Sequence, residues 1–322
     1  MQLIARWTDQ EPVRFRACEG FSWPAGRLCG SLPCHESFVQ QLRQNLLMLP
    51  LLGRYFSRRP VHISDELWRG QMQAFTLLQG LDAASLQRLR AMCEQFLAHK
   101  SLVGVRGLEL TAPMELHIAA QACLPVLHLG LGWYRGWSGI VVYPSSFRVR
   151  RKVQEESGVV HEFDASLSGE AWKGGPVVLS WEDTAELGLQ DAGQQQKPAH
   201  NLVIHEFVHQ IDLLDGEADG VPPFDRRLHR GLSRSTWMAE LEEAFERFSA
   251  EVDLIEGEIP AQVDPDSDVA DRYYARLPLD SYAATDTAEF FAVSSEAYFV
   301  RPSDIRDAFP RWYELLRRFF RN

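Results

Sequence analysis

The residues best suited to chemistry form one short motif, His205, Glu206 and His209, within the segment LVIHEFVHQIDLL (202–214). This H-E-x-x-H pattern lies in a stretch of helical character, and residues four apart on a helix stack on one face. Two imidazoles arranged in this way can bind one metal ion, typically zinc. Glu206 lies one position further round the helix, where its carboxylate can reach a water at the metal without being a ligand itself. The motif therefore predicts a hydrolytic metal site.

A chance match to this pattern is not expected. The chain has ten histidines in 322 residues, and its composition gives roughly 0.02 chance occurrences of H-E-x-x-H. The segment that starts at His161 and Glu162 begins in the same way, but Ala165 stands where the second histidine is needed. We interpret that second segment as the surface of a strand.

A catalytic zinc site needs a third protein ligand, and the nearest acids fit this role poorly. Asp215 occupies the last position of the longer pattern H-E-x-x-H-x-x-G-x-x-H, but Asp212 replaces the glycine that would turn the chain back. Asp212 shares the helix face of His209. It is either a carboxylate that orients an imidazole or a polar residue at the helix end.

Two acids in a later helix are stronger candidates for the third ligand. Glu289 and Glu296 lie seven residues apart in DTAEFFAVSSEAYF (286–299), so they can share a helix face. Both have apolar neighbours, and acids in such a run are unfavourable unless they are paired or bound to a metal. Spacing alone does not choose between the two, and either could instead lie on a solvated face.

The elements that position these residues follow from hydrophobic period and capping signals. Helices are predicted over 35–46, 83–100, 202 onward, 235–250, 286–300 and 310–320. Strands are predicted over 139–144, 146–153, 161–172 and 175–181. Because the strands come first and most helices follow, the pattern predicts an α+β fold with a small mixed or antiparallel sheet packed on helices.

The expected domain organisation is simple. Residues 1–34 lack sustained periodicity and are predicted to form an irregular extension. Residues 35–322 are expected to form a single domain whose N-terminal part, 35–100, is helical. The acidic, proline-containing stretch 256–278 is predicted to be a loop or surface insertion that can cover or reshape a cleft.

Composition limits the class of protein. A net charge of −11 argues against direct binding of nucleic acid. The odd number of cysteines, five, does not suit a disulfide framework and fits a reducing compartment. The N-terminus has no apolar stretch typical of a signal peptide, and the most hydrophobic runs, 45–52 and 122–134, are too short or interrupted to span a bilayer. We therefore expect a cytoplasmic protein that does not bind membranes.

Several blocks of the sequence resemble a known family. They are IAAQACLPVLHLG (118–130), LSGEAW (167–172), GPVVLSW (175–181), NLVIHEFVHQID (201–212), DGEADGVPP (215–223) and YAATDTAEFFAVSSEAYF (282–299). In this order they are similar to Mlc titration factor A. That family consists of zinc metallopeptidases whose catalytic core is similar to that of anthrax lethal factor. The resemblance implies a zincin-like metallopeptidase fold with the H-E-x-x-H helix in its core.

The resemblance also implies roles for individual residues. It implies that zinc is bound by His205, His209 and Glu289, and that Glu206 is the general base. The family has a tyrosine seven residues before the glutamate ligand, and Tyr282 occupies this position. Its hydroxyl would then stabilise the oxyanion of the transition state.

Further expectations follow from the same resemblance. Glu296 becomes a buried supporting residue and not a ligand. Members of the family cleave small peptides, including aminopeptidase substrates, and bind the glucose-responsive repressor Mlc, which regulates genes for sugar uptake. A peptide or protein substrate and a DNA-binding repressor are therefore the expected partners. Independently of the resemblance, the strands predicted at 139–144 and 175–181 could each offer an edge for pairing with a peptide, and 175–181 is preferred because it precedes the motif most closely.

Two other functions compete with a zinc peptidase. The chain could be a regulatory module that sequesters a repressor, with peptidase activity secondary. A pure binding module, however, has no need of Glu206 beside the two histidines. The site could also carry out a different metal-assisted hydrolysis, such as that of esters.

Overall fold

The structure is a computed structural model that describes residues 61–321, except for residues 138, 146, 155–159, 168, 172–174, 187–199, 265–266 and 268. The extension predicted over 1–34 and the helix predicted over 35–46 lie outside the described residues. The chain divides into two compact units, and the larger one, residues 60–147 and 166–322, contains the H-E-x-x-H motif. None of the described helices is both long enough and apolar enough to cross a membrane.

A four-stranded sheet lies beside the motif helix in the larger unit. Its strand order is β1 (Ser101–Gly104), β2 (Gly139–Tyr143), β6 (Val177–Ser180) and β5 (Gly169–Ala171). Strands β1, β2 and β6 are parallel, and only β5 runs antiparallel to its neighbour β6. Of the two expected forms, the sheet is therefore mixed, and the antiparallel alternative is wrong for its three main strands, which are parallel.

The reason for this difference lies in the burial of the central strands. Every residue of β2 and β6 is buried, and apart from Ser180 at the end of β6 neither strand contains a polar side chain that would mark an exposed face. Such apolar runs are typical of parallel strands covered on both faces, and they carry no alternation that would reveal a half-exposed antiparallel strand.

The preference for 175–181 as a peptide-binding edge is also wrong, because β6 is paired with both β2 and β5. Strand β5 is the edge on that side.

Strands β3 (Phe147–Gln154) and β4 (Val160–Leu167) form a separate two-stranded sheet. Both correspond to strands predicted from the sequence. Part of each belongs to the smaller unit.

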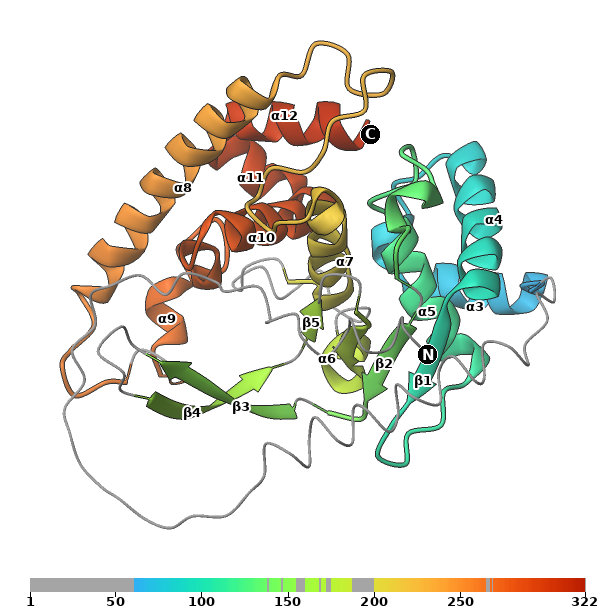
Figure 1. Ribbon diagram of the computed structural model, residues 1–322, viewed down its shortest axis with the longest axis horizontal. Coiled ribbons are helices and arrows are strands. Elements are labelled where there is room, and N and C mark those ends of the chain that lie inside the picture. Colours follow the sequence, from blue (N-terminus) through green and yellow to red (C-terminus); the bar gives the residue numbers. More distant parts are fainter. Residues whose placement is uncertain are drawn as a thin grey trace. The chain divides into compact units, whose positions relative to one another are not determined.

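The helices before the motif pack on one another at the N-terminal end of the larger unit (Figure 1). They are α3 (Asp65–Ala74), α4 (Ala83–His99) and α5 (Ala112–Cys123), with short 3-10 turns η1 (Thr76–Leu78) and η2 (Leu131–Tyr134). Helix α4 lies where the sequence predicts a helix over 83–100, and Asp82 caps it with a side chain that accepts a hydrogen bond from the Ser85 amide. Helix α5 connects the parallel strands β1 and β2.

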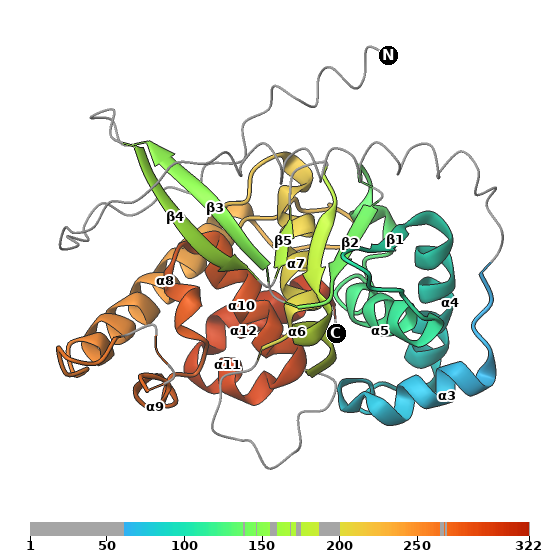
Figure 2. The ribbon, with the colours of Figure 1, turned by 90° about the horizontal axis from the view of Figure 1, so that it is seen from below.

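The remaining helices surround the motif helix α7 (Leu202–Asp212). They are α6 (Trp181–Glu186), α8 (Arg234–Glu256), α9 (Asp271–Tyr274), α10 (Thr287–Val300), α11 (Pro302–Ala308) and α12 (Pro310–Phe320), with 3-10 turns η4 (Leu213–Asp215) and η5 (Ser281–Ala284). Helix α7 contacts α5 and α10 as well as strands β5 and β6 (Figure 2). In the acidic segment 256–278, the described residues form turns around the short helix α9.

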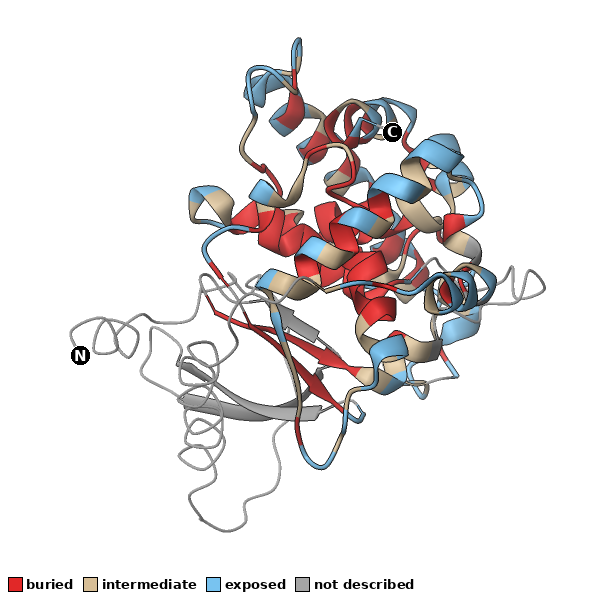
Figure 3. Cartoon of the chain, turned by 90° about the vertical axis from the view of Figure 1, so that its right-hand side faces the viewer, coloured by how far each residue is buried: buried red, intermediate tan, exposed pale blue. Residues whose placement is uncertain are grey.

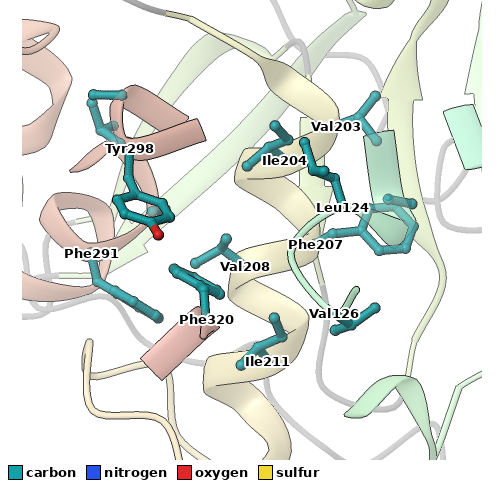
Figure 4. Packing of buried hydrophobic residues seen from close by; sticks show 14 of the residues in the cluster. Leu124, Val126, Val203, Ile204, Phe207, Val208, Ile211, Phe291, Tyr298 and Phe320 are labelled. Atoms are coloured by element: carbon teal, nitrogen blue, oxygen red, sulfur yellow. The ribbon is translucent and has the colours of Figure 1, made fainter. Parts of the chain in front are cut away.

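Helix α7 is the centre of the core, and all of its residues are buried. Val203 and Phe207 point toward Leu124 on one side of the helix, whereas Val208 faces the side on which Phe291 and Phe320 lie (Figure 4). Outer helices such as α8 are buried along one face only, as the alternation of buried and exposed segments in Figure 3 illustrates. Because the core encloses α7 on both sides, its polar side chains are held in a fixed place.

Candidate metal centre

The two histidines of the motif meet on one face of α7. Asn201 caps this helix, and its side chain accepts a hydrogen bond of 2.9 Å from the Ile204 amide. The helix then places His205 and His209 one turn apart, with ring centroids separated by 4.7 Å and Nε2 atoms by 3.1 Å. Both side chains are buried.

Helix α10 adds a carboxylate to this pair. Its N-cap, Asp286, accepts hydrogen bonds from the amides of Ala288 and Glu289, which fixes the first turn. Glu289 Oε2 lies 3.1 Å from His205 Nε2 and 3.2 Å from His209 Nε2. Among the described residues, these three form the single group of histidine, cysteine or acidic side chains able to hold a metal ion.

The spacing of the three donor atoms fits a tetrahedral metal. Zinc binds imidazole nitrogen and carboxylate oxygen at about 2.0–2.2 Å, which places neighbouring tetrahedral donors about 3.3 Å apart. The three observed separations are 3.1, 3.1 and 3.2 Å. A set of two imidazoles and one carboxylate is also a common zinc donor set, and it leaves a fourth position open.

Glu296 lies on the other side of the same imidazole. Its Oε1 is 2.6 Å from His205 Nδ1, so Nδ1–H donates to the carboxylate and the lone pair of Nε2 is left available for a metal ion. Its Oε2 accepts a hydrogen bond from the Asn201 amide and lies 3.4 Å from His200 Nδ1. The two acids that spacing could not distinguish therefore contact opposite nitrogens of His205.

The electrostatics of the site keep the carboxylates of Glu289 and Glu296 in their charged form. Burial alone would raise the pKa of Glu289, but the charges and hydrogen bonds of His209 and His205 hold that pKa well below its usual range. Burial acts in the same direction on Glu296, and hydrogen bonds from His200 and His205 outweigh it and lower the pKa to about 2. Burial would lower the pKa of His205, yet the two carboxylates raise it well above its ordinary value.

Tyr282 also contacts this centre, and Glu206 is the neighbour of His205 on α7. Glu206 follows His205 on α7 and is 4% exposed. Tyr282 comes from η5, where Asp280 accepts a hydrogen bond from the Tyr282 amide. The Tyr282 hydroxyl donates to Glu289 Oε1 at 3.3 Å, and its ring is 6.2 Å from that of His205. Because Tyr282 is 51% exposed, it lies at the solvent rim of the centre.

The two acids just after the motif lie outside the donor group. Asp212 is fully buried, and its Oδ2 accepts a hydrogen bond of 2.8 Å from the Gly220 amide. Burial raises its pKa to about 8. Asp215 is exposed and pairs with Arg234 at 3.5 Å.

Sequence reasoning missed the contacts at the start of α7. Asn201 could have been recognised as an N-cap, since asparagine directly before a helix is favoured there. The contact between His200 and Glu296 had no signal in the sequence, because the two residues are 96 positions apart and meet only in the folded chain.

The chain matches known proteins over most of its length. Residues 54–321 match a family model described as glucose-regulated metallo-peptidase M90. A protein named Mlc titration factor A from Serratia proteamaculans is 37% identical over 249 residues, which are 77% of this chain and 84% of that protein. Proteins of the same name from Salmonella arizonae and Klebsiella pneumoniae are 34% and 35% identical, over 80% and 78% of this chain and 91% and 84% of their own lengths.

Proposed function

The chain belongs to the glucose-regulated metallo-peptidase M90 family, and from this premise we propose that it is a zinc-dependent peptidase. The observation that carries the proposal is the convergence of His205, His209 and Glu289 from two helices, with Glu206 next to the first ligand on the same buried helix. These four residues supply the parts of a hydrolytic centre: three ligands, an open fourth position and a base.

Each residue has a distinct task in the proposed reaction. When bound, zinc lowers the pKa of a coordinated water toward about 7 and polarises a carbonyl group. Glu206 takes the proton from the attacking water and passes it to the leaving amine, as a general base and then a general acid. The Tyr282 hydroxyl donates a hydrogen bond to the oxygen that becomes negative in the transition state. Glu296 keeps the proton of His205 on Nδ1.

The proposal extends to the scaffold. We assign residues 35–322 to one zincin-like metallopeptidase domain, with 256–278 as a surface insertion. Strand β5 is the sheet edge that contacts α7, so an extended peptide that pairs with β5 would lie beside the metal centre. The cysteine count of five favours action in the reducing cytoplasm.

The decisive variant is Glu206→Gln, which removes the base and preserves the shape of the side chain. We expect kcat/KM for peptide hydrolysis to fall about 10²–10⁴-fold, because general base catalysis contributes that much. Zinc content, measured on the same sample, should equal that of the wild type. Glu242→Gln on the exposed face of α8 is the matched control and should retain full activity. Unchanged peptide cleavage by zinc-loaded Glu206→Gln would show that this mechanism is wrong.

A second function is favoured by the names of the relatives. Because proteins named Mlc titration factor A cover most of this chain at 34–37% identity, we also propose that it binds a repressor of the Mlc type. A pull-down of such a repressor with the wild type and with Glu206→Gln separates the two functions. Equal recovery of the repressor with both proteins would support binding that is independent of hydrolysis. If neither protein recovered the repressor, the proposed binding would be wrong.

A further inference from the structure

Two buried polar atoms near the end of α7, a carboxylate oxygen and a ring nitrogen, both lack a hydrogen-bond partner in the described part of the chain. Asp212 Oδ1 and His209 Nδ1 are both inaccessible to solvent, and neither has a hydrogen-bond partner among the described residues. The two residues are three positions apart on one helix, so their side chains share a face. An unsatisfied buried polar group destabilises a folded protein, so two such atoms on one face of a helix call for an explanation.

The chemistry of a metal-binding histidine explains why these two atoms lie on the same helix face. If His209 binds the metal through Nε2, its proton must be on Nδ1, and that proton needs an acceptor. His205 has its acceptor in Glu296, at 2.6 Å. Resting on the proposed metal site, we infer that Asp212 is a positioning residue for His209: its Oδ1 accepts the Nδ1 proton, directly or through one water, and thereby fixes the tautomer and the orientation of the ring.

The backbone turn at Gly220 holds Asp212 in place for this role. Asp212 Oδ2 is already engaged by the Gly220 amide, which leaves Oδ1 for the imidazole. The carbonyl of Gly220 accepts a hydrogen bond of 2.8 Å from Trp237 Nε1, and the neighbouring Asp219 carbonyl accepts one of 3.0 Å from Thr287 Oγ1. The same turn thus connects the end of α7 with α8 and with the start of α10, two residues before Glu289.

A purely structural role for Asp212 predicts something different. If the carboxylate served only as the acceptor for Gly220, an amide of the same shape would replace it without loss. Asp212→Asn retains an oxygen for the Gly220 amide, but it can present an NH₂ group to His209 Nδ1–H, and two donors repel. The variant therefore separates the two roles.

The test is the dissociation constant for zinc, measured by competition with a chromophoric chelator. We expect Asp212→Asn to bind zinc about 10–100-fold more weakly than the wild type, as for other partners of ligand histidines. Glu296→Gln is the matched variant for His205 and should show a loss of similar size. Asp215→Asn alters an exposed acid next to α7 and should bind zinc as the wild type does.

The outcomes distinguish this inference from the function on which it rests. If the wild type binds zinc tightly and Asp212→Asn binds it within twofold, the inference fails and the proposed function stands. If the wild type binds no zinc, both fail.

If Asp212→Asn does not fold, NMR spectra of the zinc-loaded wild type with ¹⁵N-labelled histidine test the inference instead. We expect slowly exchanging Nδ1–H signals from both ligand imidazoles, with that of His205 identified by its loss in Glu296→Gln. An Nδ1–H of His209 that exchanges freely with solvent would overturn the inference.

Discussion

At the scale of single residues, one imidazole is shared by two acids. His205 faces Glu289 through Nε2 and Glu296 through Nδ1, at 3.1 and 2.6 Å. In the proposed metal centre, the first contact places Glu289 among the candidate ligands, and the second makes Glu296 the partner that would orient His205. Both acids are buried, so burial does not distinguish them. They differ in the ring nitrogen of His205 that each one contacts.

Tyr282 provides a prediction about catalysis alone. Its hydroxyl is within hydrogen-bond distance of Glu289, but its side chain is half exposed and contributes little to the core. Tyr282→Phe should therefore lower kcat for peptide hydrolysis about 10²-fold, since loss of one donor to the oxyanion typically raises the barrier by roughly 3 kcal/mol. The melting temperature and the zinc affinity should remain those of the wild type. Steady-state kinetics with KM and kcat resolved test this, and an unchanged kcat would exclude the role.

Asp212 provides a prediction about pH. Its pKa of about 8 in the folded protein is above the ordinary 3.8, because burial penalises the charged form. Between these values the folded state binds more protons than the unfolded state, so this residue lowers stability as the pH rises from about 4 to 8. In zinc-free protein, Asp212→Asn should be more stable than the wild type at pH 8 by at least about 1 kcal/mol and should gain nothing at pH 4.

Urea unfolding of both zinc-free proteins at the two pH values measures this difference. The comparison with Asp212→Asn removes the contribution of other titrating groups, such as His205. A gain that is the same at pH 4 and pH 8 would contradict the assignment. Together with the weaker zinc binding expected above, the result would show that stability is sacrificed here for a well-oriented ligand.

At the scale of elements, the Gly220 turn links α7 to α10. Gly220 has φ of +79°, and a Cβ atom there would lie only 2.4 Å from the backbone oxygen of Thr287. Gly220→Ala should destabilise the protein by about 2–4 kcal/mol, from left-handed backbone strain plus overpacking. Because Thr287 begins α10, zinc affinity should fall as well.

Gly136→Ala is the matched control for this prediction. Gly136 also has a positive φ, +94°, but a Cβ atom there would have no neighbour within 4 Å. It should show the backbone strain of about 1–2 kcal/mol without the steric part and without any change in zinc affinity. Equal effects of the two substitutions in denaturant unfolding would mean that the close approach to Thr287 is unimportant.

Elements differ in how far the sequence could predict them. Helix α4 was predictable because it is amphipathic and is capped by Asp82, both of which are local signals. Helix α5 escaped prediction because eight of its twelve residues, Leu116 to Cys123, are buried, which erases the periodicity of a surface helix. The strand β1 is four residues long and half-buried, so it too lacked a signal. The parallel pairing that these elements create could not be predicted without them.

The candidate site shows the same contrast. The pair His205 and His209 was predictable, since helix geometry alone places residues four apart on one face. The choice between Glu289 and Glu296 was not, because the packing of α10 against α7 decides which carboxylate faces which nitrogen. The resemblance to a known family made the assignment of Glu289, and the 3.1 Å contact with His205 Nε2 is consistent with it.

At the scale of the whole molecule, the proposed metal ligands lie on helices that are far apart in sequence. His209 and Glu289 are 80 residues apart, and the segment between them contains α8 and the acidic stretch 256–278. A metal ion that binds all three ligands can do so only while α7 and α10 are packed together. Binding of zinc should therefore stabilise the folded state of the larger unit as a whole and not only the site.

The expected size of this stabilisation follows from mass action. At a free zinc concentration 100 times the dissociation constant, the free energy of unfolding should rise by about 2.7 kcal/mol, and a further tenfold increase in zinc should add about 1.4 kcal/mol. Removal of zinc by a chelator should reverse the change without unfolding the protein, because the core around α7 is apolar on both sides. Calorimetry across a zinc titration measures the dependence. Glu289→Gln should make the stability less dependent on zinc, since that variant leaves α7 intact but removes the proposed ligand contributed by α10. If Glu289→Gln responded to zinc as strongly as the wild type, the ion would be binding to α7 alone, and the link between the two helices would have no role in stability.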